Sequence, residues 1–97
     1  MFEIEFTPEA IEDLRALRKH ERNRIIEGIE RQLPHEPDLE TRNRKKLRPN
    51  QVSEWELRID RFRVFYDIDE QSRIVKVEAV GYKRGSALFI HGEEYEL

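Results

Sequence analysis

Residues 55–66 show the most regular alternation of apolar and charged side chains in the chain. Trp55, Leu57 and Ile59 are each separated by one charged residue, and this period of two is typical of a β-strand with one buried face. A turn near residues 60–61 follows, and a second alternation begins after it. The pattern therefore predicts a β-hairpin with one apolar face.

The other face of the predicted hairpin carries Arg58 and Arg63, together with Phe65. Exposed charges are the default on protein surfaces, so an ordinary amphipathic hairpin with solvated arginines is one interpretation. A binding site for an anion is the other. The basic segments on either side of the hairpin favour this second interpretation.

The N-terminal third of the chain predicts a strand followed by two helices. Residues 2–6 alternate apolar and acidic side chains, as a short strand does. Thr7 and Pro8 then begin a helix, because threonine is a favourable N-cap residue and proline suits the first helical position. Apolar stripes at 10–17 and 25–33 indicate two helices that form a hairpin.

The remaining segments predict strands. Residues 34–53 form a loop of about 20 residues, which is long for a small domain. High β-branched content makes 74–80 the predicted central strand. The glycine-containing segment 81–86 ends it, and short strands follow at 87–90 and 93–97. We therefore expect one α+β domain over residues 1–97: an N-terminal strand, a two-helix hairpin and an antiparallel β-meander.

The net charge of −3 hides a strong asymmetry along the chain. Residues 1–40 carry a net −5, residues 41–84 a net +5, and residues 85–97 a net −3. A basic middle on an acidic chain indicates a local site for an anion, such as nucleic acid or an acidic protein segment. Five basic residues are concentrated just before the hairpin: Arg42, Arg44, Lys45, Lys46 and Arg48.

Several classes of site are excluded or disfavoured. The chain has no cysteine, which excludes disulfides and thiolate metal sites. Its three histidines are widely spaced, and we predict neither a metal nor a cofactor. No apolar run approaches the roughly 20 residues of a membrane-spanning helix. The acidic N-terminus is unlike a signal peptide, so we expect a cytoplasmic protein without membrane contact.

The order of the elements, together with several short motifs, resembles the RelE/ParE superfamily of toxins from bacterial type II toxin–antitoxin modules. The resemblance extends to about Phe89, and it depends on the order and spacing of motifs that are individually short. These motifs are Lys46–Leu47–Arg48, Trp55-x-Leu57-Arg58, Arg63-Val64-Phe65-Tyr66 and Val80–Gly81.

The resemblance implies a chemistry. RelE-like members cleave mRNA in the ribosomal A site without a metal, and the RNA's own 2′-hydroxyl is the nucleophile. The protein supplies cations around the scissile phosphate and a general acid or base. By resemblance Arg58, Arg63 and Lys83 occupy catalytic positions, and His91 is the added candidate for proton transfer, since an imidazole ordinarily titrates near neutral pH. The expected RNA contacts are Arg42, Arg44, Lys45, Lys46, Arg48, Arg84 and Phe89.

Two positions depart from the RelE-type ribonucleases. Glu56 stands where many of them carry a basic residue, and its charge is wrong for binding phosphate. Phe89 stands at the position of a C-terminal tyrosine, and a phenyl ring stacks on a base but transfers no proton. Tyr82, His91 and Tyr95 are the alternatives for that transfer.

Three functions follow from the resemblance. The leading hypothesis is a toxin that acts as a metal-independent mRNA endoribonuclease and inhibits translation at the ribosome. The second is a ParE-like inhibitor of DNA gyrase, and the third is an inactive module that binds only an antitoxin or nucleic acid. In each case a cognate antitoxin is the expected partner, often through an acidic segment that folds on binding.

Overall fold

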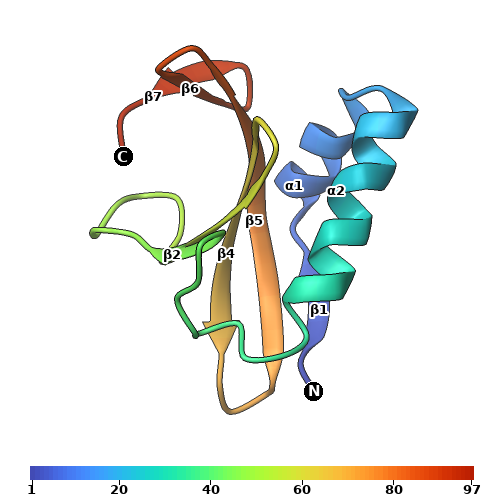
Figure 1. The fold of residues 1–97 in the computed structure, drawn as a ribbon, viewed down its shortest axis with the longest axis vertical. Coiled ribbons are helices and arrows are strands. Elements are labelled where there is room, and N and C mark those ends of the chain that lie inside the picture. The colour runs from blue at the N-terminus through green and yellow to red at the C-terminus, as the bar shows by residue number, and fades with distance from the viewer.

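Two helices pack against one face of a seven-stranded sheet in the computed structural model, which describes residues 1–97 (Figure 1). The sheet order is β2–β3–β4–β5–β6–β7, and β1 pairs in parallel with β5. The predicted α+β fold is thus confirmed. In chain order the elements are β1 (Glu3–Phe6), α1 (Pro8–Arg15), α2 (Lys19–Gln32), β2 (Arg44–Lys46), β3 (Trp55–Ile59), β4 (Phe62–Asp69), β5 (Ile74–Arg84), β6 (Ala87–Ile90) and β7 (Glu93–Tyr95).

The helical hairpin forms where the apolar stripes predict it. Thr7 caps α1, and its Oγ1 accepts a hydrogen bond from the Ala10 N–H at 3.1 Å. A short break separates α1 from α2. Leu14 from α1 and Ile25 and Ile29 from α2 are buried in the main core between the helices and the sheet.

The β3–β4 hairpin also matches the prediction. Trp55, Leu57 and Ile59 face the helices, and Tyr66 lies opposite Trp55 with the two ring centroids 6.1 Å apart. Asp60 adopts a positive φ of 54° in the tight turn between the strands. The alternate residues of both strands therefore project from the opposite face of the sheet.

Two predicted boundaries were wrong. The expected loop at 34–53 contains β2, whose three residues pair with β3 in antiparallel register. The segment 81–86 does not end the central strand at Gly81, because β5 continues to Arg84. A Cβ at position 81 would collide with the carbonyl oxygen of Phe89, so this glycine allows β6 to pair closely with β5.

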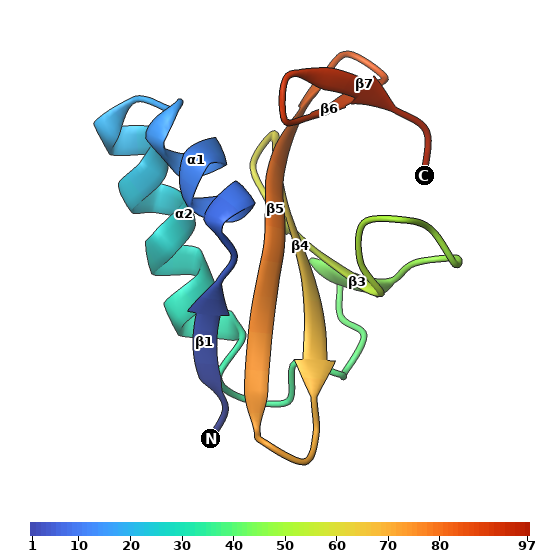
Figure 2. The same ribbon diagram turned by 180° about the vertical axis from the view of Figure 1, so that it is seen from behind.

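The sheet has two differently covered faces. The two helices lie on one face, as Figures 1 and 2 show from opposite sides. The loop 47–54 and the β6–β7 hairpin project from the other face, and a small apolar cluster of Phe65, Ala79, Leu88 and Ile90 lies between them. This second face is where Arg58 and Arg63 project. Neither helix is long and apolar enough to cross a membrane.

Candidate functional site

A cavity of about 490 Å³ lies on the face of the sheet that the helices leave open. In Figure 2 the C-terminal hairpin and the loop 47–54 border this face. Six basic and two acidic residues contribute to the lining, so we call it the cationic cavity. Its lining residues are Lys45, Lys46, Leu47, Arg48, Glu56, Arg58, Arg63, Lys83, Ser86, Leu88, Tyr95, Glu96 and Leu97.

Three strands bring the three predicted catalytic cations into this cavity. The β3–β4 register places Arg58 directly opposite Arg63, so both side chains leave the same face of the sheet. Lys83 joins them from the end of β5. Like charges directly opposite each other destabilise an antiparallel pair, so folding alone does not favour this arrangement. Such local conflicts are expected at sites kept for binding or catalysis.

Arg63 is held in place by the backbone. Its Nη1 donates to the carbonyl oxygens of Asp60 and Phe62, both at 2.9 Å, and its buried Nε has no hydrogen-bond partner. Burial lowers the pKa of the Arg63 guanidinium; the Glu56 carboxylate opposes this effect, and the Arg58 guanidinium adds to it. The structure thus presents a positioned, partly desolvated cation, which binds an anion more strongly than a solvated arginine does.

Glu56 lies on the floor of the cationic cavity. It is only 7% exposed, and its Oε2 accepts a hydrogen bond from Arg58 Nε at 3.1 Å. The β2–β3 register places Lys45 opposite Glu56, on the same face. The sequence identified the unusual charge at this position, but its burial among cations follows only from the pairing of β2 with β3.

The basic cluster before the hairpin divides in the structure. Lys45, Lys46 and Arg48 line the cationic cavity. Arg42 is exposed and does not line it. Arg44 instead reaches the end of α2, where its Nη1 donates to three backbone carbonyl oxygens. Only part of the predicted RNA contact surface is therefore brought together.

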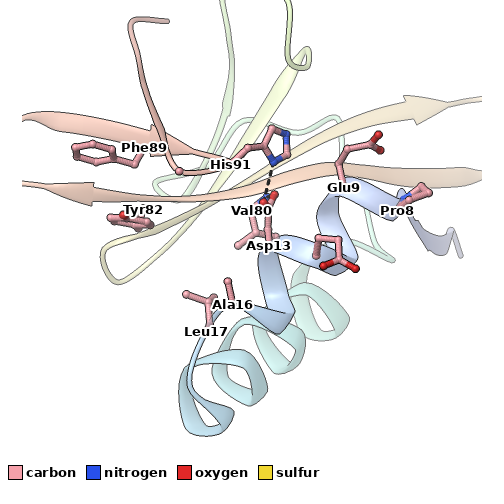
Figure 3. Close-up of a pocket in the computed structure, with 11 residues that line it drawn as sticks. Pro8, Glu9, Asp13, Ala16, Leu17, Val80, Tyr82, Phe89 and His91 are labelled. Atoms are coloured by element: carbon pink, nitrogen blue, oxygen red, sulfur yellow. Dashed lines mark hydrogen bonds and ion pairs between the residues drawn. The ribbon is translucent and has the colours of Figure 1, made fainter.

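Arg84 and Phe89 do not line the cationic cavity. Phe89 pairs with Tyr82 across β5 and β6, and the two rings stack with centroids 5.4 Å apart. The Arg84 guanidinium lies 5.9 Å from the Phe89 centroid and 6.0 Å from that of Tyr82. These rings border a second cavity, of about 710 Å³, between α1 and the β5–β6 strands (Figure 3).

His91 also lies in this second cavity, away from the three cations. Its Nδ1 is 2.7 Å from Asp13 Oδ1, as the dashed line in Figure 3 shows. The other carboxylate oxygen of Asp13 accepts the Val80 N–H at 2.9 Å. His91 therefore ties the β6–β7 turn to α1, and the structure does not bring it to the predicted catalytic residues.

Tyr95 is the one alternative proton-transfer residue that lines the cationic cavity. It lies on β7 opposite Leu88, which faces the cationic cavity, so its side chain shares that face. The only sequence signal for the position of Tyr95 was the short strand predicted at residues 93–97.

The described residues offer no metal centre. No group of three or more histidine, aspartate or glutamate side chains is arranged to hold a metal ion. The polar groups that line the cationic cavity are six guanidinium and ammonium groups, the carboxylates of Glu56 and Glu96, the Ser86 hydroxyl and the Tyr95 phenol.

Residues 4–86 match the model of the family described as the ParE toxin of the type II toxin–antitoxin system parDE. The chain belongs to this family, and so to the toxins of the RelE/ParE superfamily.

Solved structures agree with this assignment. The chain is similar to a chain of the RelBE2 toxin–antitoxin complex from Mycobacterium tuberculosis, with 26% identity, a TM-score of 0.73, and coverage of 84% of this chain and 91% of that one. It also shares the fold of a chain in the archaeal RelE–RelB complex from Pyrococcus horikoshii OT3, at 20% identity and a TM-score of 0.67, covering 87% and 96%. No curated protein matches the chain.

Proposed function

We propose that this toxin is a RelE-like endoribonuclease that cleaves mRNA at the ribosome and thereby inhibits translation. The observation that carries the proposal is the convergence of Arg58, Arg63 and Lys83 in one cavity. Three cationic donors suit a phosphate whose negative charge increases as it is attacked, and the structure holds two of them, Arg58 and Arg63, by side-chain hydrogen bonds. Lys45, Lys46 and Arg48 extend the basic surface along the path of an RNA strand.

We assign separate tasks to the residues of the cationic cavity. Arg63, which the backbone holds by two hydrogen bonds, is suited to stabilise the pentacoordinate phosphorane. Arg58 and Lys83 are suited to orient the flanking phosphate oxygens. Tyr95 supplies the hydroxyl for the leaving 5′-oxygen, a role that the sequence resemblance left open among Tyr82, His91 and Tyr95.

We also propose that a cognate antitoxin controls the toxin. Both structural neighbours were solved as complexes of a toxin with its antitoxin. An acidic antitoxin segment laid over the cationic cavity would neutralise the same side chains that bind RNA. Binding of toxin to antitoxin should therefore compete with binding of toxin to RNA.

Controlled expression in a bacterium tests the proposal. The wild type should arrest growth and produce new mRNA 5′ ends within coding regions, which primer extension detects. Arg63→Ala and Lys83→Ala should each lower the cleavage rate about 100-fold or more, since each removes a donor to the transition state. Arg31→Ala is the matched control, because Arg31 pairs with Glu27 on the exposed face of α2. A harmless wild type, or an equally toxic Arg63→Ala variant, would contradict the proposal.

A ParE-like action on DNA gyrase is the second candidate. Two observations favour it: the family model is that of the ParE toxin, and Glu56 reduces the positive charge of the cationic cavity. A supercoiling assay with purified gyrase separates the two functions. Inhibition of supercoiling without mRNA cleavage would establish the gyrase target. If the toxin neither inhibits gyrase nor cleaves mRNA, it is a module that only binds its antitoxin.

A further inference from the structure

Glu56 is an unusual side chain for the floor of a phosphate-binding site. It is buried, and it shares the cationic cavity with Arg58, Arg63 and Lys45. A carboxylate here weakens the attraction for an anionic ligand, and burying a charge is costly unless that charge is paired. An apolar or neutral residue would fit the neighbouring small apolar cluster without either disadvantage, so the geometry points to a chemical role for this charge.

The hydrogen bonding of Glu56 leaves one oxygen free for that role. Oε2 accepts a hydrogen bond from Arg58 Nε at 3.1 Å, and no side chain or backbone group of the protein donates a hydrogen bond to Oε1. Arg58 thus fixes the orientation of the carboxylate while the second oxygen keeps its lone pairs. A carboxylate oriented by a guanidinium and open on one side has the arrangement required of a general base.

The cationic cavity offers few other groups that could accept a proton. Arginine and lysine side chains are hydrogen-bond donors without an acceptor lone pair for a proton, and the phenol of Tyr95 is already assigned as the proton donor. His91 faces the second cavity and contacts Asp13 instead. Glu96 is the other carboxylate in the lining, but it is exposed and has no hydrogen-bond donor that would orient it.

We propose that Glu56 is the proton acceptor in RNA cleavage, an inference that rests on the proposed ribonuclease function. Glu56 removes the proton of the 2′-hydroxyl as that oxygen forms a bond to the adjacent phosphorus. The bond from phosphorus to the 5′-oxygen breaks, and this oxygen takes a proton from the Tyr95 hydroxyl. The products are a 2′,3′-cyclic phosphate and a 5′-hydroxyl, and a proton from Glu56 restores Tyr95 through solvent. Arg58 is a positioning residue for Glu56 as well as a phosphate ligand.

Single-turnover cleavage of an mRNA bound in the A site of programmed ribosomes tests this assignment. Glu56→Gln keeps the size and removes the base, so cleavage should slow about 100-fold or more. The decrease in the wild-type rate toward low pH should disappear from the pH profile of the variant. The variant should bind the same mRNA with a 2′-deoxy substitution at least as tightly as the wild type, because one negative charge is gone. A purely structural role for Glu56 would not separate binding from cleavage in this way.

The alternative outcomes are distinct. If the wild type cleaves and Glu56→Gln cleaves as fast or faster, Glu56 is a counterion only, and this assignment is overturned while the ribonuclease function stands. If the wild type leaves mRNA intact, the proposed function fails and this assignment fails with it. Should Glu56→Gln lose its folded near-UV circular dichroism, Glu56→Asp replaces it. Its shorter carboxylate should slow cleavage about 10-fold and keep the low-pH decrease, and an unchanged rate would overturn the assignment.

Discussion

Glu78 is the extra residue of β5 at a β-bulge, since Phe65 of β4 pairs with Ala79 and Tyr66 pairs with Val77. Burial, a hydrogen bond with Asp67 and repulsion from the Asp67 carboxylate together raise the pKa of Glu78 to about 7. The bulge thus places a carboxyl group beside a second one under the loop 47–54. Bulges are common beside functional sites, where they redirect side chains.

The raised pKa of Glu78 makes the free energy of unfolding depend on pH. The folded chain keeps a proton that the unfolded chain releases above the ordinary value of 4.5, so stability falls as the pH rises from about 4.5 to about 7 and stays low above it. Glu78→Gln should remove this decrease and make the protein about 1–2 kcal/mol more stable at pH 8. This range is smaller than the free energy that corresponds to the whole pKa shift, because Glu78 is only partly buried and solvent screens its charge.

Urea unfolding at a series of pH values measures this effect. Glu70→Gln is the matched control, because Glu70 is an exposed turn residue whose removal should leave the slope unchanged. A Glu78→Gln variant with the wild-type pH dependence between 4.5 and 7 would show that Glu78 is ionised throughout that range in the folded state.

Arg44 connects two elements that the sequence left separate. Its Nη1 lies 3.0 Å from the carbonyl oxygens of Gln32, His35 and Glu36. Gln32 is the last residue of α2, and the other two lie in the segment just after it. The last carbonyls of a helix lack partners within the helix, and a cation there also interacts favourably with the helix dipole. Arg44 therefore fastens β2 to the C-terminal end of α2.

Arg44→Ala should consequently reduce stability more than RNA binding. Removing a charged donor from three carbonyl oxygens, one of them in a partly buried hydrogen bond, should cost about 2 kcal/mol, or roughly 10 °C in Tm for a domain of this size. Thermal unfolding measures the loss. Arg42→Ala is the control, since Arg42 is an exposed neighbour with no hydrogen bond from its side chain, and it should leave Tm unchanged. Equal Tm values for both variants would show that the α2 contacts contribute nothing.

The elements that the sequence predicted well are those with a single clear period. The β3–β4 hairpin and the two helices follow from side-chain alternation and apolar stripes alone, and the structure confirms them. The strand β2 was missed because its three residues are all basic, and its strand conformation comes from pairing with β3. The continuation of β5 through Gly81 was missed because a glycine usually interrupts a strand, whereas here it admits the β6 backbone.

The candidate site was predictable only in part, for a related reason. Alternation within one hairpin placed Arg58 and Arg63 on a common face, and the position of Lys83 came from the family resemblance. The roles of Arg44 and His91 depend on partners distant in sequence, the end of α2 and Asp13, which no local pattern reveals. A basic residue in the sequence therefore predicts a charge, and the tertiary contact decides whether that charge is free to bind a ligand.

For the molecule as a whole, the basic middle segment becomes a site on one face instead of a uniformly basic surface. If RNA binds in the cationic cavity, its affinity should fall with salt in proportion to the number of phosphates contacted, with a slope of about −0.7 per phosphate for a single strand. If Arg58, Arg63 and Lys83 each contact one phosphate, together they contribute about −2 to this slope, and Lys83→Ala should make it shallower by about 0.7.

Fluorescence anisotropy with a short single-stranded RNA, substituted with 2′-deoxy nucleotides to prevent cleavage, measures this slope between low and physiological salt. Arg31→Ala should retain the wild-type slope, because Arg31 lies on α2, on the side of the sheet opposite the cationic cavity. Loss of affinity without a change of slope in Lys83→Ala would mean that Lys83 acts through packing. An equal decrease in slope for both variants would mean that RNA binds the whole surface, because a cation on either face would then contribute equally to the attraction.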